Sequence, residues 1–148
     1  MNGRDVSFRR RGRGFTLVEA LVALLALSIG LLGVAGLQLS GLRNNLSAAW
    51  RSQATYLSYD VIDRIRANRN ARTSYRVAFG GVPGAAAGAP VAQNDLAAWK
   101  ANLAAALPGG DGSITVNGAN DTVVTVRIRW NDERGTGTPL EFVTETRL

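Results

Sequence analysis

An uninterrupted apolar segment dominates the first third of the chain. Between Phe15 and Leu42 there is no lysine or arginine, and Glu19 is the only charged residue. A helix over residues 15–37 would be about 35 Å long at roughly 1.5 Å per residue, which is enough to cross a bilayer. The pattern therefore predicts a membrane-spanning helix with one carboxylate a single turn from its start.

After Arg43 the pattern changes from wholly apolar to amphipathic. Apolar residues recur at steps of three and four, which is the period of one helical face. This stripe consists of Leu46, Trp50, Ala54, Leu57, Val61 and Ile65. We therefore expect one helix to continue to near Asn70, with its amphipathic half, residues 43–70, packed on a soluble head.

The rest of the chain predicts a second, short helix. Residues 80–90 are rich in glycine, alanine and proline, as is typical of a loop. Asn94 is the expected N-cap of a helix that runs to about Leu107, where Pro108 and two glycines end it. Its apolar spacing predicts a face buried through Leu96, Trp99, Leu103 and Leu107.

The C-terminal third predicts strands. They are expected at residues 114–116, 122–130 and 140–147. The second strand alternates apolar and polar residues without interruption, which indicates one buried and one exposed face. Three antiparallel strands packed on the amphipathic half-helix would give an α+β head over residues 43–148.

The composition excludes much chemistry. The 148 residues include no cysteine, no histidine and one lysine, so the chain can form no disulfide and lacks the commonest general base and metal ligand. Asp111, Asn117, Asn120 and Asp121 supply oxygens near two turns and could suggest calcium, but such residues also serve tight turns, and their spacing matches no EF-hand loop. We expect no enzymatic activity, no cofactor and no metal.

The junction before the apolar segment carries the most specific features. Five arginines, at positions 4, 9, 10, 11 and 13, precede it. Basic flanks stay in the cytoplasm, which predicts that everything after Leu42 lies outside. A carboxylate at membrane depth costs on the order of 3 kcal/mol, so Glu19 is a candidate functional residue unless it reaches the headgroups. A cut between Gly14 and Phe15 would create an amine one helical turn from Glu19.

The stretch Gly14-Phe15-Thr16-Leu17-Val18-Glu19-Ala20 resembles the cleavage and methylation signature of type IV prepilins. The resemblance implies that prepilin peptidase removes a leader of residues 1–14 and N-methylates Phe15. It also implies that Glu19 docks on the N-terminal amine of a neighbouring subunit, because an ion pair in lipid relieves the cost that either charge bears alone. An ordinary secretory signal, with a shorter apolar core and a cut at its far end, is the alternative.

Further stretches resemble the PilV-type minor pilins, also called type IV pilus modification proteins. They cover residues 27–33, 51–68, 95–99, 107–110 and 130–132. The resemblance implies the type IV pilin fold and a low-abundance subunit that primes pilus assembly near the fibre tip. Heads in that family often carry cysteines, and this one has none.

The same resemblance implies the partners and the location of the chain. The implied partners are other minor pilins, the major pilin, prepilin peptidase and the inner-membrane assembly machinery. Before assembly the chain would cross the inner membrane once, with its N-terminus in the cytoplasm and its head in the periplasm. Afterwards it would belong to the cell-surface pilus.

Two features and two rival functions stay open. Gly30, Gly33 and Gly36 indicate either close helix packing or local unwinding, since each glycine costs a helix about 1 kcal/mol relative to alanine. The arginines at positions 64, 66, 69, 72 and 76 fit either a helix C-terminus or a phosphate backbone. The rivals are a minor pseudopilin of a type II secretion system and a DNA-binding minor pilin, although we do not expect nucleic-acid binding.

Overall fold

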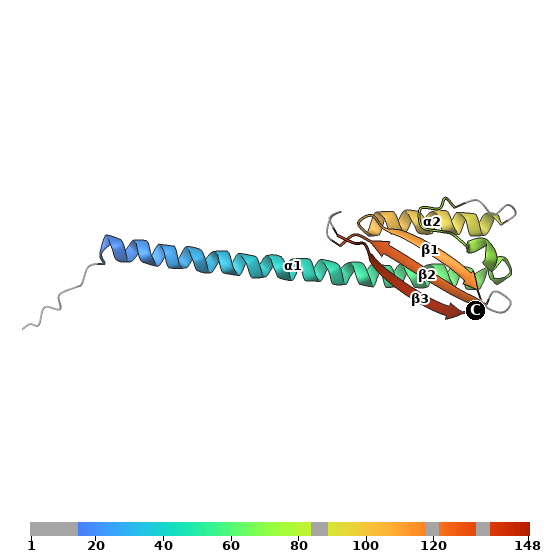
Figure 1. Ribbon diagram of the computed structural model, residues 1–148, viewed down its shortest axis with the longest axis horizontal. Coiled ribbons are helices and arrows are strands. Elements are labelled where there is room, and N and C mark those ends of the chain that lie inside the picture. Colours follow the sequence, from blue (N-terminus) through green and yellow to red (C-terminus); the bar gives the residue numbers. More distant parts are fainter. Residues whose placement is uncertain (1–14, 84–88, 118–121, 133–136) are drawn as a thin grey trace, which may run out of the picture. The chain divides into compact units, whose positions relative to one another are not determined.

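The computed structural model describes residues 15–83, 89–117, 122–132 and 137–148 (Figure 1). The chain divides into two compact units, Met1–Leu42 and Arg43–Leu148. Helix α1 (Leu17–Ala67) contributes to both units. The leader, including Gly14, lies outside the described residues.

The apolar segment, residues 15–42, forms the first part of α1. Every one of its side chains is exposed in the single chain. By length and composition the helix is able to cross a membrane, as the sequence predicts. Thr16 begins it, because its Oγ1 accepts a hydrogen bond from the amide of Glu19 (3.2 Å). Thr16 and Glu19 therefore have the spacing of a capping box, three residues apart at the helix start.

The head, Arg43–Leu148, combines the rest of α1 with a short 3₁₀ helix, a second α-helix and a sheet. These elements are η1 (Arg69–Tyr75), α2 (Pro90–Ala106), β1 (Asp111–Asn117), β2 (Val123–Trp130) and β3 (Leu140–Arg147). The strands are antiparallel in the order β1-β2-β3. This α+β architecture matches the type IV pilin fold, so the predicted fold class is confirmed.

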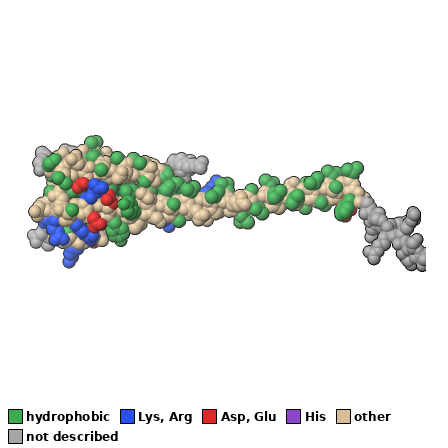
Figure 2. All heavy atoms as spheres, turned by 180° about the vertical axis from the view of Figure 1, so that it is seen from behind, with side chains coloured by type: hydrophobic (Ala, Val, Ile, Leu, Met, Phe, Trp, Pro, Cys, Tyr) green, Lys and Arg blue, Asp and Glu red, His purple; other side chains and the backbone are tan. Residues whose placement is uncertain are grey.

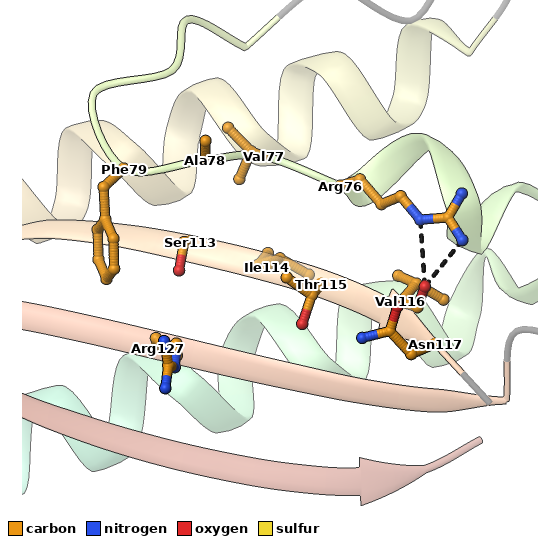
Figure 3. Close-up of a pocket in the computed structure, with 10 residues that line it drawn as sticks. All are labelled: Arg76, Val77, Ala78, Phe79, Ser113, Ile114, Thr115, Val116, Asn117 and Arg127. Carbon is orange, nitrogen blue, oxygen red and sulfur yellow. Dashed lines mark hydrogen bonds between the residues drawn. The ribbon is translucent and has the colours of Figure 1, made fainter.

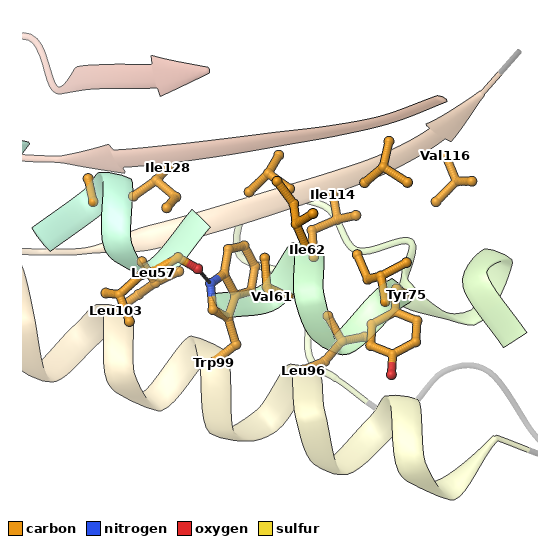
Figure 4. Close-up of a cluster of buried hydrophobic side chains, with 14 of the residues drawn as sticks. Leu57, Val61, Ile62, Tyr75, Leu96, Trp99, Leu103, Ile114, Val116 and Ile128 are labelled. Atoms are coloured by element: carbon orange, nitrogen blue, oxygen red, sulfur yellow. Dashed lines mark hydrogen bonds between the residues drawn. The ribbon is translucent and has the colours of Figure 1, made fainter. Parts of the chain in front are cut away.

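One hydrophobic core holds the head together. Side chains from α1, α2 and the inner face of the sheet meet in it (Figure 4). The even-numbered residues of β2, from Val124 to Trp130, are all buried, as the alternating pattern predicts. Trp99 of α2 is fully buried, and its Nε1 donates to the carbonyl oxygen of Leu57 in α1 (3.0 Å), which fixes the two helices together.

The amphipathic stripe of α1 enters this core over most of its length. Leu57, Val61 and Ile65 are buried, and Trp50 is partly buried against the core. Leu46 is not a core residue, because it is 50% exposed. The next residue, Ser47, donates a hydrogen bond from its Oγ to Asp132 Oδ2 (2.8 Å). From this residue onward α1 contacts the rest of the head.

Three predicted boundaries are wrong. Helix α1 ends at Ala67 instead of continuing to near Asn70, and η1 follows it. Helix α2 begins at Pro90 and not after Asn94, because proline is favourable at the first helical position, where its missing N–H costs nothing. Strand β1 starts at Asp111, three residues earlier than expected.

Candidate functional site

The predicted processing and docking residues, Phe15 and Glu19, lie at the start of the apolar segment. Phe15 is 84% exposed, and Glu19 is exposed as well. The side chain of Glu19 has no hydrogen-bond or ion-pair partner among the described residues. Placing an unpaired carboxylate in a membrane is energetically costly. An ion pair between Glu19 and a cationic group of another molecule would therefore be favourable there.

The three glycines of the apolar segment contact nothing in the single chain. A Cβ atom added at Gly30, Gly33 or Gly36 would have no atom within 4 Å apart from its chain neighbours and the backbone of its own helix. Helix α1 runs through all three positions without interruption. Any packing role of these glycines therefore involves another molecule.

Two arginines of the head's cluster, Arg64 and Arg66, are paired with carboxylates. Arg64 is paired with Asp60 of its own helix and with Asp95 of α2, each at 3.1 Å. Arg66 is paired with Asp63 at 3.0 Å. Figure 2 shows acidic side chains adjoining basic ones on the head. The hydrogen bonds from Arg64 to Asp60 and Asp95 raise the pKa of Arg64 above its ordinary value.

Two more arginines of the cluster, Arg72 and Arg76, bond to backbone oxygens of the head. Arg72 donates to the carbonyl oxygen of Arg69 (3.0 Å). Arg76 donates to the carbonyl oxygen of Val116 through two nitrogens, at 2.8 and 3.2 Å. Four of the five arginines, Arg64, Arg66, Arg72 and Arg76, thus hold carboxylate or backbone oxygens of the head, which favours a structural role for them over contact with a phosphate backbone.

Asp95 joins α2 to η1 as well as to α1. The hydroxyl of Tyr75, which is fully buried, donates to Asp95 Oδ2 at 2.6 Å. The amide of Asn68 donates to the same hydroxyl at 3.3 Å. Burial and the bond to Asp95 raise the pKa of Tyr75 to about 12. The Tyr75 phenol is therefore uncharged at neutral pH, and its hydrogen bonds join η1 to α2.

Asp111 is a second junction, and the sequence pattern did not reveal it. Its carboxylate accepts hydrogen bonds from Lys100 (2.6 Å), Arg129 (3.1 Å) and the amides of Gly80 and Gly112 (both 2.8 Å). These donors come from α2, β2, the segment before α2 and β1 itself. Such a junction has no local signal, because its members are far apart in the sequence.

These contacts bear on the calcium alternative. Asp111 and Asn117 lie at the two ends of β1, about 20 Å apart at roughly 3.3 Å per residue, and Asp111 is occupied by cationic donors. Asn120 and Asp121 lie outside the described residues. Within the described part of the chain, no three acidic, histidine or cysteine side chains converge on a metal position.

A shallow groove of about 480 Å³ lies on the outer face of the sheet (Figure 3). Its floor includes Ser113, Thr115 and Arg127, and the segment from Arg76 to Phe79 forms its wall. Arg127 is paired with Glu141 (3.1 Å). Because none of these groups is a nucleophile with an adjacent base, the groove has no evident catalytic use.

Comparison with known proteins identifies one family feature. Residues 9–35 match the model of the prokaryotic N-terminal methylation motif. This match supports a type IV pilin-like or pseudopilin-like protein, and it suggests a structural role for the chain. No curated protein and no solved structure is detectably similar to it. The motif and the apolar helix are together consistent with inner-membrane anchoring before assembly.

Proposed function

We propose that this chain is a minor pilin that primes or supports type IV pilus assembly together with other minor pilins, near the fibre tip. The observation that carries the proposal is the apolar segment. It bears the methylation motif, exposes all of its described side chains in the single chain, and leaves Glu19 without a partner. Such a helix is suited to burial among identical or similar helices.

Processing supplies the partner for Glu19. Cleavage between Gly14 and Phe15 frees an amine at Phe15, which is then methylated. In a growing fibre this amine of one subunit pairs with Glu19 of the next. Each charge then meets its opposite at membrane depth instead of remaining alone there, which removes a cost of several kcal/mol.

The head selects neighbouring subunits. Its partners are the other minor pilins and the major pilin, and the inner-membrane assembly machinery receives the processed chain. The N-terminus lies in the cytoplasm and the head in the periplasm until assembly moves the chain to the cell surface. Five arginines before the apolar segment support this orientation.

A minor pseudopilin of a type II secretion system is the second candidate, because the methylation motif supports it equally. The resemblance of the head to PilV-type minor pilins favours the pilus. A DNA-binding role is not favoured, since Arg64 and Arg66 are paired with carboxylates and Arg76 with a backbone oxygen.

An in-frame deletion distinguishes the two systems. Sheared surface pili and secreted exoproteins are scored in the same cultures, with the wild-type chain restored as a control. The proposal expects lost pili and intact secretion. Intact pili with lost secretion would assign the chain to the secretion apparatus, and no change in either would contradict an assembly role.

A further inference from the structure

The groove on the outer face of the sheet has a polar floor whose side chains the fold does not use (Figure 3). Ser113, Thr115 and Asn117 share one face of β1, because alternate residues of a strand lie on the same face. Their hydroxyl and amide groups have no hydrogen-bond partner in the part of the chain that the structure describes. The floor is therefore a row of unused polar groups about 13 Å long at roughly 3.3 Å per residue.

Ser113 is the most informative residue of this row. Only 6% of it is exposed, yet its hydroxyl bonds to none of the described residues. Removing a hydroxyl from water without a new hydrogen bond lowers stability, so a group of this kind calls for an explanation. Figure 3 shows its oxygen directed from β1 toward Arg127 of β2, the residue opposite Ser113 in the sheet. A ligand in the groove would supply the missing bond.

The backbone of β1 beside the groove is already occupied. Val77 bonds to both backbone groups of Ile114, at 2.8 and 3.0 Å. The carbonyl oxygen of Val116 accepts from Arg76. An extended peptide is therefore unable to join the sheet here by backbone pairing, which is the usual attachment of a peptide to a sheet edge.

The remaining groups suit a sugar. Hydroxyl and amide side chains both donate and accept hydrogen bonds, as the hydroxyls of a sugar ring require. Phe79 lies at one end of the groove as a partly buried aromatic ring, with the guanidinium of Arg129 4.3 Å from its centroid. An aromatic ring is a suitable surface for the C–H groups on the face of a sugar.

The charges at the groove favour an anionic ligand. Among the residues that line it, the charged ones are Arg76 and Arg127, and both are cationic. Arg127 forms an exposed ion pair with Glu141 (3.1 Å), and surface pairs of this kind are weak and exchange readily. The Arg127 guanidinium is therefore able to bind a ligand carboxylate through two parallel hydrogen bonds.

We propose that this groove binds an acidic polysaccharide built from uronic acids. Ser113, Thr115 and Asn117 bond to sugar hydroxyls, Phe79 packs against a ring, and Arg127 binds a carboxylate. A uronic acid chain offers a carboxylate and free hydroxyls on every ring. In peptidoglycan, by contrast, peptide stems block the carboxylates of the glycan, so that polymer offers less to Arg127.

Calorimetric titration of the full-length chain tests the proposal. The chain is held in micelles of a detergent without a sugar headgroup, and the probe is trigalacturonate. The matched control is the galactose trimer of the same linkage, which keeps the ring hydroxyls and lacks the carboxylates. Trigalacturonate should bind saturably, and the uncharged trimer at least about tenfold more weakly. Absence of trigalacturonate binding, or equal binding of the two trimers, would overturn the proposal.

Two further probes represent competing ligands. A triglutamate peptide carries the same charge on a peptide backbone, and a disaccharide-peptide fragment represents peptidoglycan. Both should bind more weakly than trigalacturonate. If the peptide binds as tightly, the groove takes an acidic protein segment; if the fragment binds as tightly, its ligand is the cell wall. Either result contradicts the proposal.

Loss of the floor hydroxyls connects binding to the groove. Ser113→Ala combined with Thr115→Val removes two hydroxyls that bond to no described residue, so the variant should melt at the wild-type temperature. It should bind trigalacturonate about tenfold more weakly, because two hydrogen bonds are lost. Thr125→Val is the matched control, since Thr125 is opposite Thr115 in the sheet but does not line the groove. Wild-type affinity in the folded double variant would refute the site.

Arg127→Gln tests the carboxylate contact. The floor is unchanged in this variant, so the uncharged trimer should bind as before while the affinity for trigalacturonate falls to a similar value. Arg147→Gln, on β3 outside the groove, is the control for net charge. If Arg127→Gln still prefers trigalacturonate, the assignment of Arg127 fails. These titrations are independent of pili and secretion, so this proposal and the proposed function are able to fail separately.

Discussion

At the residue scale, two carboxylates join the elements of the head. Asp111 accepts from α2, β2 and the segment that precedes α2, and Asp95 joins α2 to α1 and η1. Each group concentrates several hydrogen bonds at one position, so a change of its charge affects several elements at once.

The first prediction concerns Asp111 and acid. Burial by itself raises the pKa of Asp111, but hydrogen bonds from Lys100, Gly80 and Gly112 outweigh it and hold the pKa below its ordinary value. The stability from this group is therefore present above about pH 4 and is lost as the pH falls through the lower pKa of the folded state. We expect Asp111→Asn to lower the free energy of unfolding by about 2 kcal/mol at pH 7, with a smaller loss at pH 3.

Urea unfolding of the full chain at both pH values measures this difference. The result would be contradicted if the variant lost the same free energy at pH 3 as at pH 7.

The second prediction concerns Tyr75 and base. The folded pKa of about 12 exceeds the ordinary value of about 10, so the stability from this phenol is complete below pH 10 and lost as the pH rises through 12. Tyr75→Phe should cost about 1–2 kcal/mol at neutral pH, because Asp95 loses a donor. Ultraviolet titration of phenolate should show one fewer group ionising near pH 12 in the variant, and an unchanged titration curve would refute the assignment.

At the scale of elements, packing explains which boundaries the sequence could not show. The bounds of β3 agree with the predicted range because its turn residues and alternation are local signals. The start of β1 was missed because Asp111-Gly112 resembles a turn, whereas Gly112 is required by the Trp99 ring that lies against it. The sequence predicts a later start for α2, because Pro90 follows several other helix breakers and is therefore assigned to the preceding loop. The Asp111 and Asp95 junctions depend on tertiary contacts that no local pattern contains.

The third prediction tests that packing. A Cβ atom at position 112 would collide with the side chains of Trp99 and Leu103, so Gly112→Ala should destabilise the head by about 1–3 kcal/mol. The matched control is Gly41→Ala, where a Cβ atom meets nothing within 4 Å. That change should leave the head unaffected and strengthen the helix by up to about 1 kcal/mol. Thermal unfolding monitored by tryptophan fluorescence compares the two, and equal melting temperatures would argue against the close contact.

At the scale of the whole molecule, the first turn of α1 combines a helix cap with the proposed docking residue. Thr16 caps the helix by accepting from the backbone amide of Glu19, while the side chain of Glu19 is free for the proposed pairing with a neighbour. The T-x-x-E spacing is a local signal from which this cap could have been predicted. Substitutions separate the cap of Thr16 from the charge of Glu19.

The fourth prediction uses this separation. Glu19→Gln removes the charge and keeps the backbone amide that bonds to Thr16, while Thr16→Val removes the cap and keeps the charge. If charge pairing drives docking, both Glu19→Gln and Glu19→Ala should be cleaved normally and recovered at least tenfold less in sheared pili. The recovery of Thr16→Val in sheared pili should fall much less. Recovery of Glu19→Gln at the wild-type amount would show that the charge is not needed.

The fifth prediction concerns processing. Gly14→Ala should mostly block cleavage, so the chain should keep the mass of the precursor when membranes are analysed by mass spectrometry. A wild-type control should lose residues 1–14 and gain one methyl group on Phe15. Full conversion of the Gly14→Ala variant would place the cut elsewhere.

The apolar segment has a consequence for the chain outside a lipid environment. All of its side chains from residue 15 to residue 42 are exposed in the single chain. Without lipid or detergent this surface would meet water, and a contiguous apolar surface of that extent drives aggregation. Purification of the full-length chain would therefore need a detergent at every step.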